Sequence, residues 1–182
     1  MADFPIAGIG SSTGGLDALE RLFDAMPGDP GVVFVVIAHL DPTRESHLTE
    51  LLSRHTKMPV VEVQGELTVE ANHVYVIAPD QSLELEGDLL RPSKPSEPRA
   101  QRRPVDIFFR SLAENQKERA IGIILSGTGT NGSAGLHQIR GRPRHRAGSR
   151  NRGLCRDAPE RHQHRRGRPG AAATSHGGGA GR

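Results

Sequence analysis

A serine near the N-terminus lies in a pattern that is typical of activated nucleophiles. Residues 10–14 read Gly-Ser-Ser-Thr-Gly and match G-x-S-x-G, with Ser12 at the position of the nucleophile. In this motif a sharp turn between a strand and a helix exposes the hydroxyl, and the flanking glycines avoid steric clashes. The N–H groups at the start of the helix stabilise negative charge beside the serine. The pattern therefore predicts acyl transfer, while a serine helix cap and a phosphate-binding turn are the alternatives.

A histidine comes at the end of the next strand expected along the chain. A serine hydroxyl is a poor nucleophile without a base, and His39 closes the strand that begins with the apolar run 32–37. Parallel strands end at the same edge of a sheet, so we expect the imidazole near Ser12. The alternative is a core histidine that binds only a backbone carbonyl.

A third residue is needed to orient the imidazole and to stabilise its charged form. The end of the last expected strand offers Asn131, within the glycine-rich residues 127–132. An amide can fix the ring, but it carries no charge to stabilise an imidazolium.

Residues 127–132 also match G-x-G-x-x-G, the phosphate-binding fingerprint of dinucleotide folds. The match makes a nucleotide-binding α/β module an alternative function, but the acidic strand end that should follow the fingerprint is absent, which counts against it.

The hydrophobic pattern predicts the elements that must position these residues. Expected strands cover 4–9, 32–37, 58–63, 74–77, 82–85, 89–90 and 120–125, and expected helices cover 16–26, 45–54 and 105–113. Strands that alternate with helices indicate βαβ units. We therefore expect an α/β fold: a doubly wound, mostly parallel sheet with helices on both faces, in three layers.

Charge divides the 182 residues into two parts. Residues 1–140 carry 13 basic and 19 acidic side chains, a net charge of −6, and are long enough for one domain with a core. Residues 141–182 carry 11 arginines and 2 acids, a net charge of +9, and Leu154 is their only large aliphatic residue. Such a segment cannot bury enough apolar surface to offset its chain entropy. We expect a domain at 1–140 and a disordered basic tail at 141–182.

Composition also bears on location, metals and nucleic acids. No apolar run is long enough to span a bilayer and no signal peptide is recognisable, so we expect a cytoplasmic protein without membrane insertion. The single cysteine, Cys155, lies in the tail, and no Cys/His spacing indicates a metal site. The arginines would attract phosphates, but the tail has no aromatic residue to stack on bases. Nucleic acid is therefore not the expected partner.

Five ordered segments resemble the catalytic domain of the CheB protein-glutamate methylesterases of bacterial chemotaxis. They are 6–16 (IAGIGSSTGGL), 36–42 (VIAHLDP), 74–79 (VYVIAP), 103–111 (RPVDIFFRS) and 124–132 (ILSGTGTNG). The forms of the second and fifth segments look most like the CheB domain that is fused to a CheR methyltransferase in signalling proteins.

This resemblance implies a hydrolase that cleaves glutamate γ-methyl esters on chemoreceptors and releases methanol. It implies Ser12 as the nucleophile and His39 as the general base, with backbone N–H groups of Thr13 and Thr128 forming the oxyanion hole. It also implies a methylated chemoreceptor as the protein substrate, methyltransferase or histidine-kinase modules of a phosphorelay as further partners, and no metal or organic cofactor.

Two departures from the family pattern bear on activity. The family's aspartate falls at Asn131, and an Asp-to-Asn change in a serine-protease triad costs about 10⁴ in turnover. The resemblance stops beyond about Ile139, and we hypothesise that the following residues are an out-of-frame reading of a GC-rich gene, which leaves the domain incomplete at its C-terminal end. A catalytically impaired remnant is therefore a second alternative.

Overall fold

The computed structural model describes residues 3–11, 15–38, 47–98, 101–126 and 131–141. The elements in chain order are β1 (Ile6–Ser11), α1 (Leu16–Asp24), β2 (Val33–Ala38), α2 (Leu48–Ser53), β3 (Val60–Val63), β4 (Leu67–Thr68), β5 (Val74–Ile77), β6 (Ser82–Glu86), β7 (Leu89–Ser93), α3 (Pro104–Gln116), the 3-10 turn η2 (Lys117–Arg119), β8 (Ala120–Ser126) and α4 (Ser133–Arg140).

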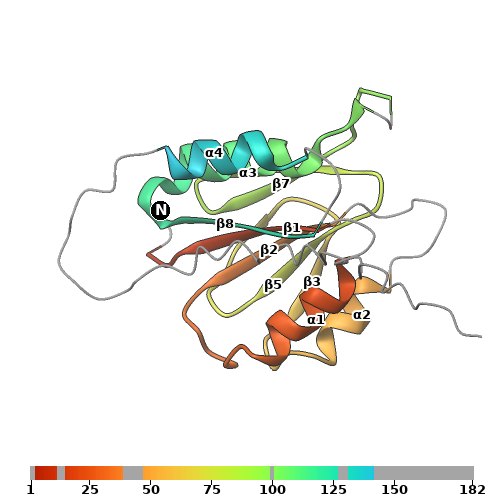
Figure 1. The fold of residues 1–182 in the computed structure, drawn as a ribbon, viewed down its shortest axis with the longest axis vertical. Coiled ribbons are helices and arrows are strands. Elements are labelled where there is room, and N and C mark those ends of the chain that lie inside the picture. The colour runs from red at the N-terminus through yellow and green to blue at the C-terminus, as the bar shows by residue number, and fades with distance from the viewer. Residues whose placement is uncertain (1–2, 12–14, 39–46, 99–100, 127–130, 142–182) are drawn as a thin grey trace, which may run out of the picture.

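Five parallel strands form the middle layer, in the order β3-β5-β2-β1-β8. Helices α1 and α2 lie on one face of this sheet, and α3 and α4 lie on the other (Figure 1). The structure thus confirms the expected three-layer α/β fold with a mostly parallel sheet.

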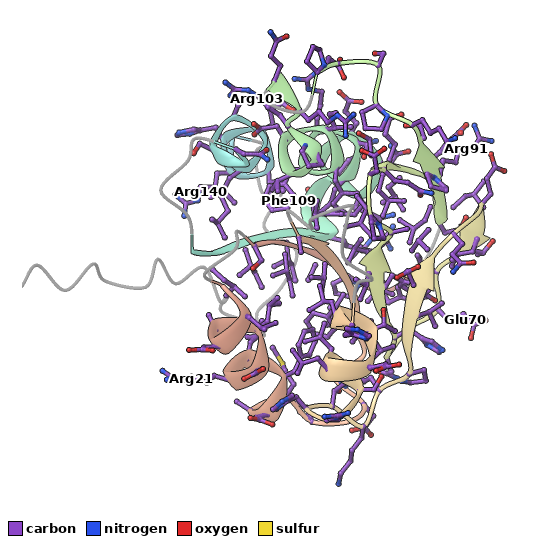
Figure 2. All side chains as sticks on the ribbon, turned by 90° about the vertical axis from the view of Figure 1, so that its right-hand side faces the viewer. Arg21, Glu70, Arg91, Arg103, Phe109 and Arg140 are labelled. Atoms are coloured by element: carbon purple, nitrogen blue, oxygen red, sulfur yellow. The ribbon has the colours of Figure 1, made fainter. Side chains whose placement is uncertain are left out.

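Both faces of the central sheet are buried, which explains why its strands read as unbroken apolar runs. Along β1, the side chain of Ile6 packs with the α3 side of the core, whereas Ala7 and Ile9 pack with the α1 and α2 side. Figure 2 shows Phe109 between the α3 and α4 layer and the sheet, and this side chain is fully buried. The alternation follows from the two-residue period of a strand.

A second sheet of three antiparallel strands, in the order β4-β7-β6, packs against α3. The β6 and β7 strands were expected as a hairpin, but β4 was not, because two residues are too few to carry a periodic signal. The loop before β5 is tied to the central sheet by Tyr75, whose hydroxyl accepts the N–H of Glu70 at 2.9 Å. Burial raises the pKa of the Tyr75 hydroxyl above its ordinary value.

Two strand ends at the candidate site differ from the expected boundaries, and one helix there was not among the expected elements. Strand β1 continues through Gly10 to Ser11, past the expected end at residue 9. Strand β2 ends at Ala38, and α4 follows β8 up to Arg140. Residues 142–182, which make up the predicted tail apart from Gly141, lie outside the described residues.

Candidate active site

The carboxyl ends of three neighbouring strands define the candidate site. Strand β1 lies between β2 and β8, and its last residue, Ser11, is the Cα partner of Ala38 on one side and of Ser126 on the other. The register to β8 shifts between Gly10 and Ser11. Irregularities of this kind bend a strand and recur next to active sites.

The helices that come next after β1 and β8 in the chain lie on opposite faces of the sheet (Figure 1). Helix α1 follows β1 and packs through Leu19 and Phe23 on one face, while α4 follows β8 and packs through Leu136 and Ile139 on the other, beside α3 (Figure 1). Such a divergence at the carboxyl edge is a topological switch point, and α/β proteins bind their ligands there. The strand order therefore marks the edge beside β1 and β8 as the binding region.

Most of the predicted site residues lie outside the described residues. Ser12, Thr13, His39 and Thr128 belong to this group. In the chain, Ser12 directly follows the end of β1, and His39 directly follows the end of β2. Asn131 is described: it is half-buried and precedes the N-cap of α4.

The side chain of Asn131 contacts the start of α3. Its Oδ1 accepts a hydrogen bond from the backbone N–H of Asp106, with a distance of 3.3 Å between the two atoms. The Asp106 carboxylate is itself buried, and its Oδ1 accepts the N–H of Gly135 in α4 at 2.9 Å. These contacts join the first turn of α3 to the residues that follow β8.

Asp106 lies in the segment 103–111 that resembles the family, but no role was predicted for it. A signal was present: an acidic residue in the first turn of a helix, surrounded by the apolar residues Val105, Ile107, Phe108 and Phe109. An isolated acid in such a setting is seldom buried unless it has partners.

The side chain of Val105 fills gaps left by two glycines at this edge. A β-carbon placed on Gly10 would lie 2.6 Å from Val105 Cγ1, and one placed on Gly132 would lie 2.7 Å from the same atom. Gly132 also has a φ of +96°, which side chains disfavour. Glycine at these positions therefore lets α3 approach the ends of β1 and β8.

Close packing of α3 also explains the glycine at position 8, farther back in β1. A β-carbon on Gly8 would lie 2.8 Å from the ring of Phe109 and 2.9 Å from that of Phe108. The Gly8-Ile9-Gly10 spacing is thus explained by close packing of α3 on the strand. A nucleotide phosphate is not needed to explain it.

Neither a metal-binding cluster nor a membrane-spanning helix is found among the described residues. Within residues 3–11, 15–38, 47–98, 101–126 and 131–141, no group of three or more His, Cys, Asp or Glu side chains is arranged to hold a metal ion. No helix in the same part of the chain has the length and apolar character needed to cross a membrane.

The fold and the position of the site define an open α/β domain whose candidate site lies at the carboxyl edge of its first strand. Residues 7–145 match the family model described as CheB methylesterase. The chain belongs to the CheB methylesterase family.

Similar proteins include both longer relatives and a solved domain. A protein-glutamate methylesterase/protein-glutamine glutaminase of Vibrio vulnificus is 32% identical over 144 residues, which cover 76% of this chain and 41% of that protein. An uncharacterized 104.1 kDa protein of Rhodobacter capsulatus is 41% identical over 92 residues, or 50% of this chain and 10% of that protein. The crystal structure of the Thermotoga maritima CheB methylesterase catalytic domain matches with a TM-score of 0.68 at 26% identity, covering 76% of each chain. The chain therefore spans less than half the length of these two longer relatives.

Proposed function

We propose that this chain is a serine esterase that hydrolyses glutamate γ-methyl esters on chemoreceptors and releases methanol. The observation that carries the proposal is the register at the carboxyl edge, where Ser11 is paired with both Ala38 and Ser126. Ser12 and His39 are the next residues after two of these paired strand ends. Membership of the family and the relative named as a protein-glutamate methylesterase/protein-glutamine glutaminase support the same activity.

In the proposed reaction Ser12 Oγ attacks the ester carbonyl carbon, and His39 takes the hydroxyl proton as general base. The backbone N–H groups of Thr13 and Thr128 stabilise the oxyanion of the tetrahedral intermediate. His39 then gives its proton to the departing methoxide, so methanol leaves and a glutamyl ester of Ser12 remains. Water, activated by the same imidazole, hydrolyses this ester and regenerates the serine.

Asn131 limits the rate in this proposal. An asparagine beside the imidazole does not hold it in the productive tautomer, and the corresponding change in a serine protease lowers turnover about 10⁴-fold. We expect slow hydrolysis by the chain as it stands. An aspartate at position 131 should raise the rate.

The setting of the activity belongs to the same proposal. The substrate is a methylated chemoreceptor, the location is the cytoplasm, and methyltransferase or histidine-kinase modules of a phosphorelay are further partners. Residues 1–140 carry the esterase domain, and residues 141–182 form a separate basic tail.

Methanol release from a peptide that contains a glutamate γ-methyl ester tests the activity. We expect the full chain to release methanol slowly and Asn131→Asp to release it up to about 10⁴-fold faster. Adding Ser12→Ala to either protein should abolish the release. Ser53→Ala, which changes an exposed serine on α2, is the matched control and should leave the rate unchanged. Equal background release by the full chain, by Asn131→Asp and by the Ser12→Ala variants would instead identify a remnant without esterase activity.

A further inference from the structure

Asp106 caps a helix other than its own. Helix α4 has Gly132 as its N-cap residue, which offers no side-chain acceptor for the first N–H groups of the helix. The N–H of Gly135, the third residue of α4, binds Asp106 Oδ1 at 2.9 Å. A side-chain acceptor of the N-cap residue normally makes this bond, but here it comes from the first turn of α3. Asp106 therefore fixes where α4 begins, directly after residues 131 and 132.

The backbone of the same residue sets the orientation of the Asn131 side chain. A backbone N–H can only donate, so the Asn131 atom that faces the Asp106 nitrogen at 3.3 Å must be the carbonyl oxygen Oδ1. The amide group Nδ2 is consequently the atom of residue 131 that is left for another partner. One residue of α3 thus controls both the main chain after Asn131 and the direction of its side chain.

We propose that Asp106 is a positioning residue of the active site, which acts by aligning residue 131 against the catalytic histidine. This inference rests on the proposed function, in which residue 131 orients His39. Asp106 does not touch the substrate in this proposal. It determines which side-chain atom of residue 131 is presented to the imidazole.

The two residue types at position 131 then have opposite consequences. With asparagine, the presented atom is Nδ2, a donor, so a neutral imidazole must accept there and must carry its own proton on the other nitrogen. That nitrogen has no lone pair left to take the proton of Ser12. With aspartate, the presented atom is the second carboxylate oxygen, which accepts the imidazole N–H and leaves the other nitrogen free to act as the base. The same alignment therefore prevents the imidazole from acting as a base when residue 131 is asparagine and allows it to do so when residue 131 is aspartate.

The contacts of the Asp106 carboxylate show which substitution separates its charge from its hydrogen bond to α4. Its side chain is 6% exposed, its Oδ2 has no hydrogen-bond partner among the described residues, and Arg103 Nη1 lies 3.9 Å away. Arg103 is 59% exposed, and Figure 2 shows it on the outside of the molecule. Because Oδ1 alone makes the bond to α4, an amide at position 106 can keep that bond while it removes the charge.

Kinetics in the Asn131→Asp background test the role. We expect Asp106→Ala to lower kcat by about 10- to 100-fold, because it removes the hydrogen bond that holds the start of α4, with KM changed less than about threefold. Asp106→Asn should restore kcat to within about threefold of the parent, since the acceptor for Gly135 remains. Each kcat is divided by the concentration of serine that a fluorophosphonate labels, so a loss of folded protein does not count as a loss of catalysis.

Glu114→Gln is the matched control, because it removes one exposed carboxylate from the same helix. It should leave kcat and KM unchanged. The proposal is overturned if Asp106→Ala keeps the parent kcat per labelled serine, or if Asp106→Asn is as slow as Asp106→Ala.

A second measurement separates this proposal from the proposed function. Amide hydrogen exchange, followed by NMR, should be at least about tenfold faster at Gly135 in Asp106→Ala and unchanged there in Asp106→Asn. If exchange behaves in this way but no variant hydrolyses the ester, the esterase assignment fails while the capping of α4 by Asp106 holds. Unchanged exchange at Gly135 in Asp106→Ala would show that Asp106 does not hold the start of α4, which overturns the proposed positioning role.

Discussion

Space around single side chains decides which residues fit at the candidate site. Val105 Cγ1 occupies the volume that a β-carbon on Gly10 would need, at 2.6 Å. Gly10→Ala is therefore expected to lower the free energy of unfolding by about 1–3 kcal/mol, the usual cost of an added methyl group in a packed core. Urea denaturation followed by circular dichroism measures this change.

A compensating substitution and a control test the cause of that loss. Val105→Ala removes the clashing methyl groups, so the double variant should be less destabilised than the sum of the two single changes. Gly65→Ala adds a methyl group where no atom lies within 4 Å, and it should change the free energy of unfolding by less than about 0.5 kcal/mol. Strict additivity of Gly10→Ala and Val105→Ala would contradict the steric explanation.

Residue identity and spacing predict only part of this site. Ser12, His39 and Asn131 follow strand ends that the hydrophobic pattern reveals, so the sequence could nominate them. An acid in the first turn of an apolar helix was a local signal for Asp106, but its role could not be predicted, because its partners lie 25 and 29 positions further along the chain. Gly10 was interpreted as part of a turn, with a phosphate site as an alternative, whereas the structure shows that this glycine lets α3 pack closely on β1, which is a tertiary property.

At the scale of elements, α3 holds the second sheet through polar side chains. Asn115 Nδ2 donates to the carbonyl of Leu85 at 2.8 Å and to that of Ser111 at 2.9 Å, and its Oδ1 accepts the N–H of Gly87 at 2.9 Å. Asn115→Ala leaves the groups of β6 and its turn without these partners. We expect the free energy of unfolding to fall by about 2–4 kcal/mol, measured by urea denaturation.

The control for this prediction is the neighbouring exposed residue of α3. Glu114→Ala should change the free energy of unfolding by less than about 0.5 kcal/mol. Faster amide exchange at Gly87 in Asn115→Ala, with unchanged exchange in β1, would locate the loss in the second sheet. If Asn115→Ala and Glu114→Ala behave alike, water replaces the three hydrogen bonds at no cost and the polar link does not matter.

Elements differed in how well the sequence predicted them, and burial explains the difference. Strands β2, β5 and β8 were expected within one or two residues, because a strand buried on both faces is a continuous apolar run. Strand β4 was missed, since Leu67 and Thr68 form a strand only through pairing with β7. The end of β1 was placed too early because the sequence pattern treats its glycines as turn residues.

At the scale of the whole molecule, β8 is an edge strand of the central sheet among the described residues. Ile121, Ile123 and Leu125 of β8 are only partly buried against the cluster that contains α1. The match to the Thermotoga maritima domain covers 76% of that chain, so part of that domain has no counterpart in the match. These observations raise the question of whether residues 142–182 add to the stability of the domain.

We expect them to add nothing, because Leu154 is their only large aliphatic residue and 11 arginines must stay hydrated. A chain that ends at Gly141 should keep the free energy of unfolding of the full chain to within about 0.5 kcal/mol in urea denaturation at moderate salt. A chain that ends at Ser126 loses α4, whose Leu136 and Ile139 pack on the core, and should be strongly destabilised. A loss of more than about 1 kcal/mol on deletion of residues 142–182 alone would instead mean that this segment packs on the domain, with the partly buried face of β8 as the first place to look for the contact.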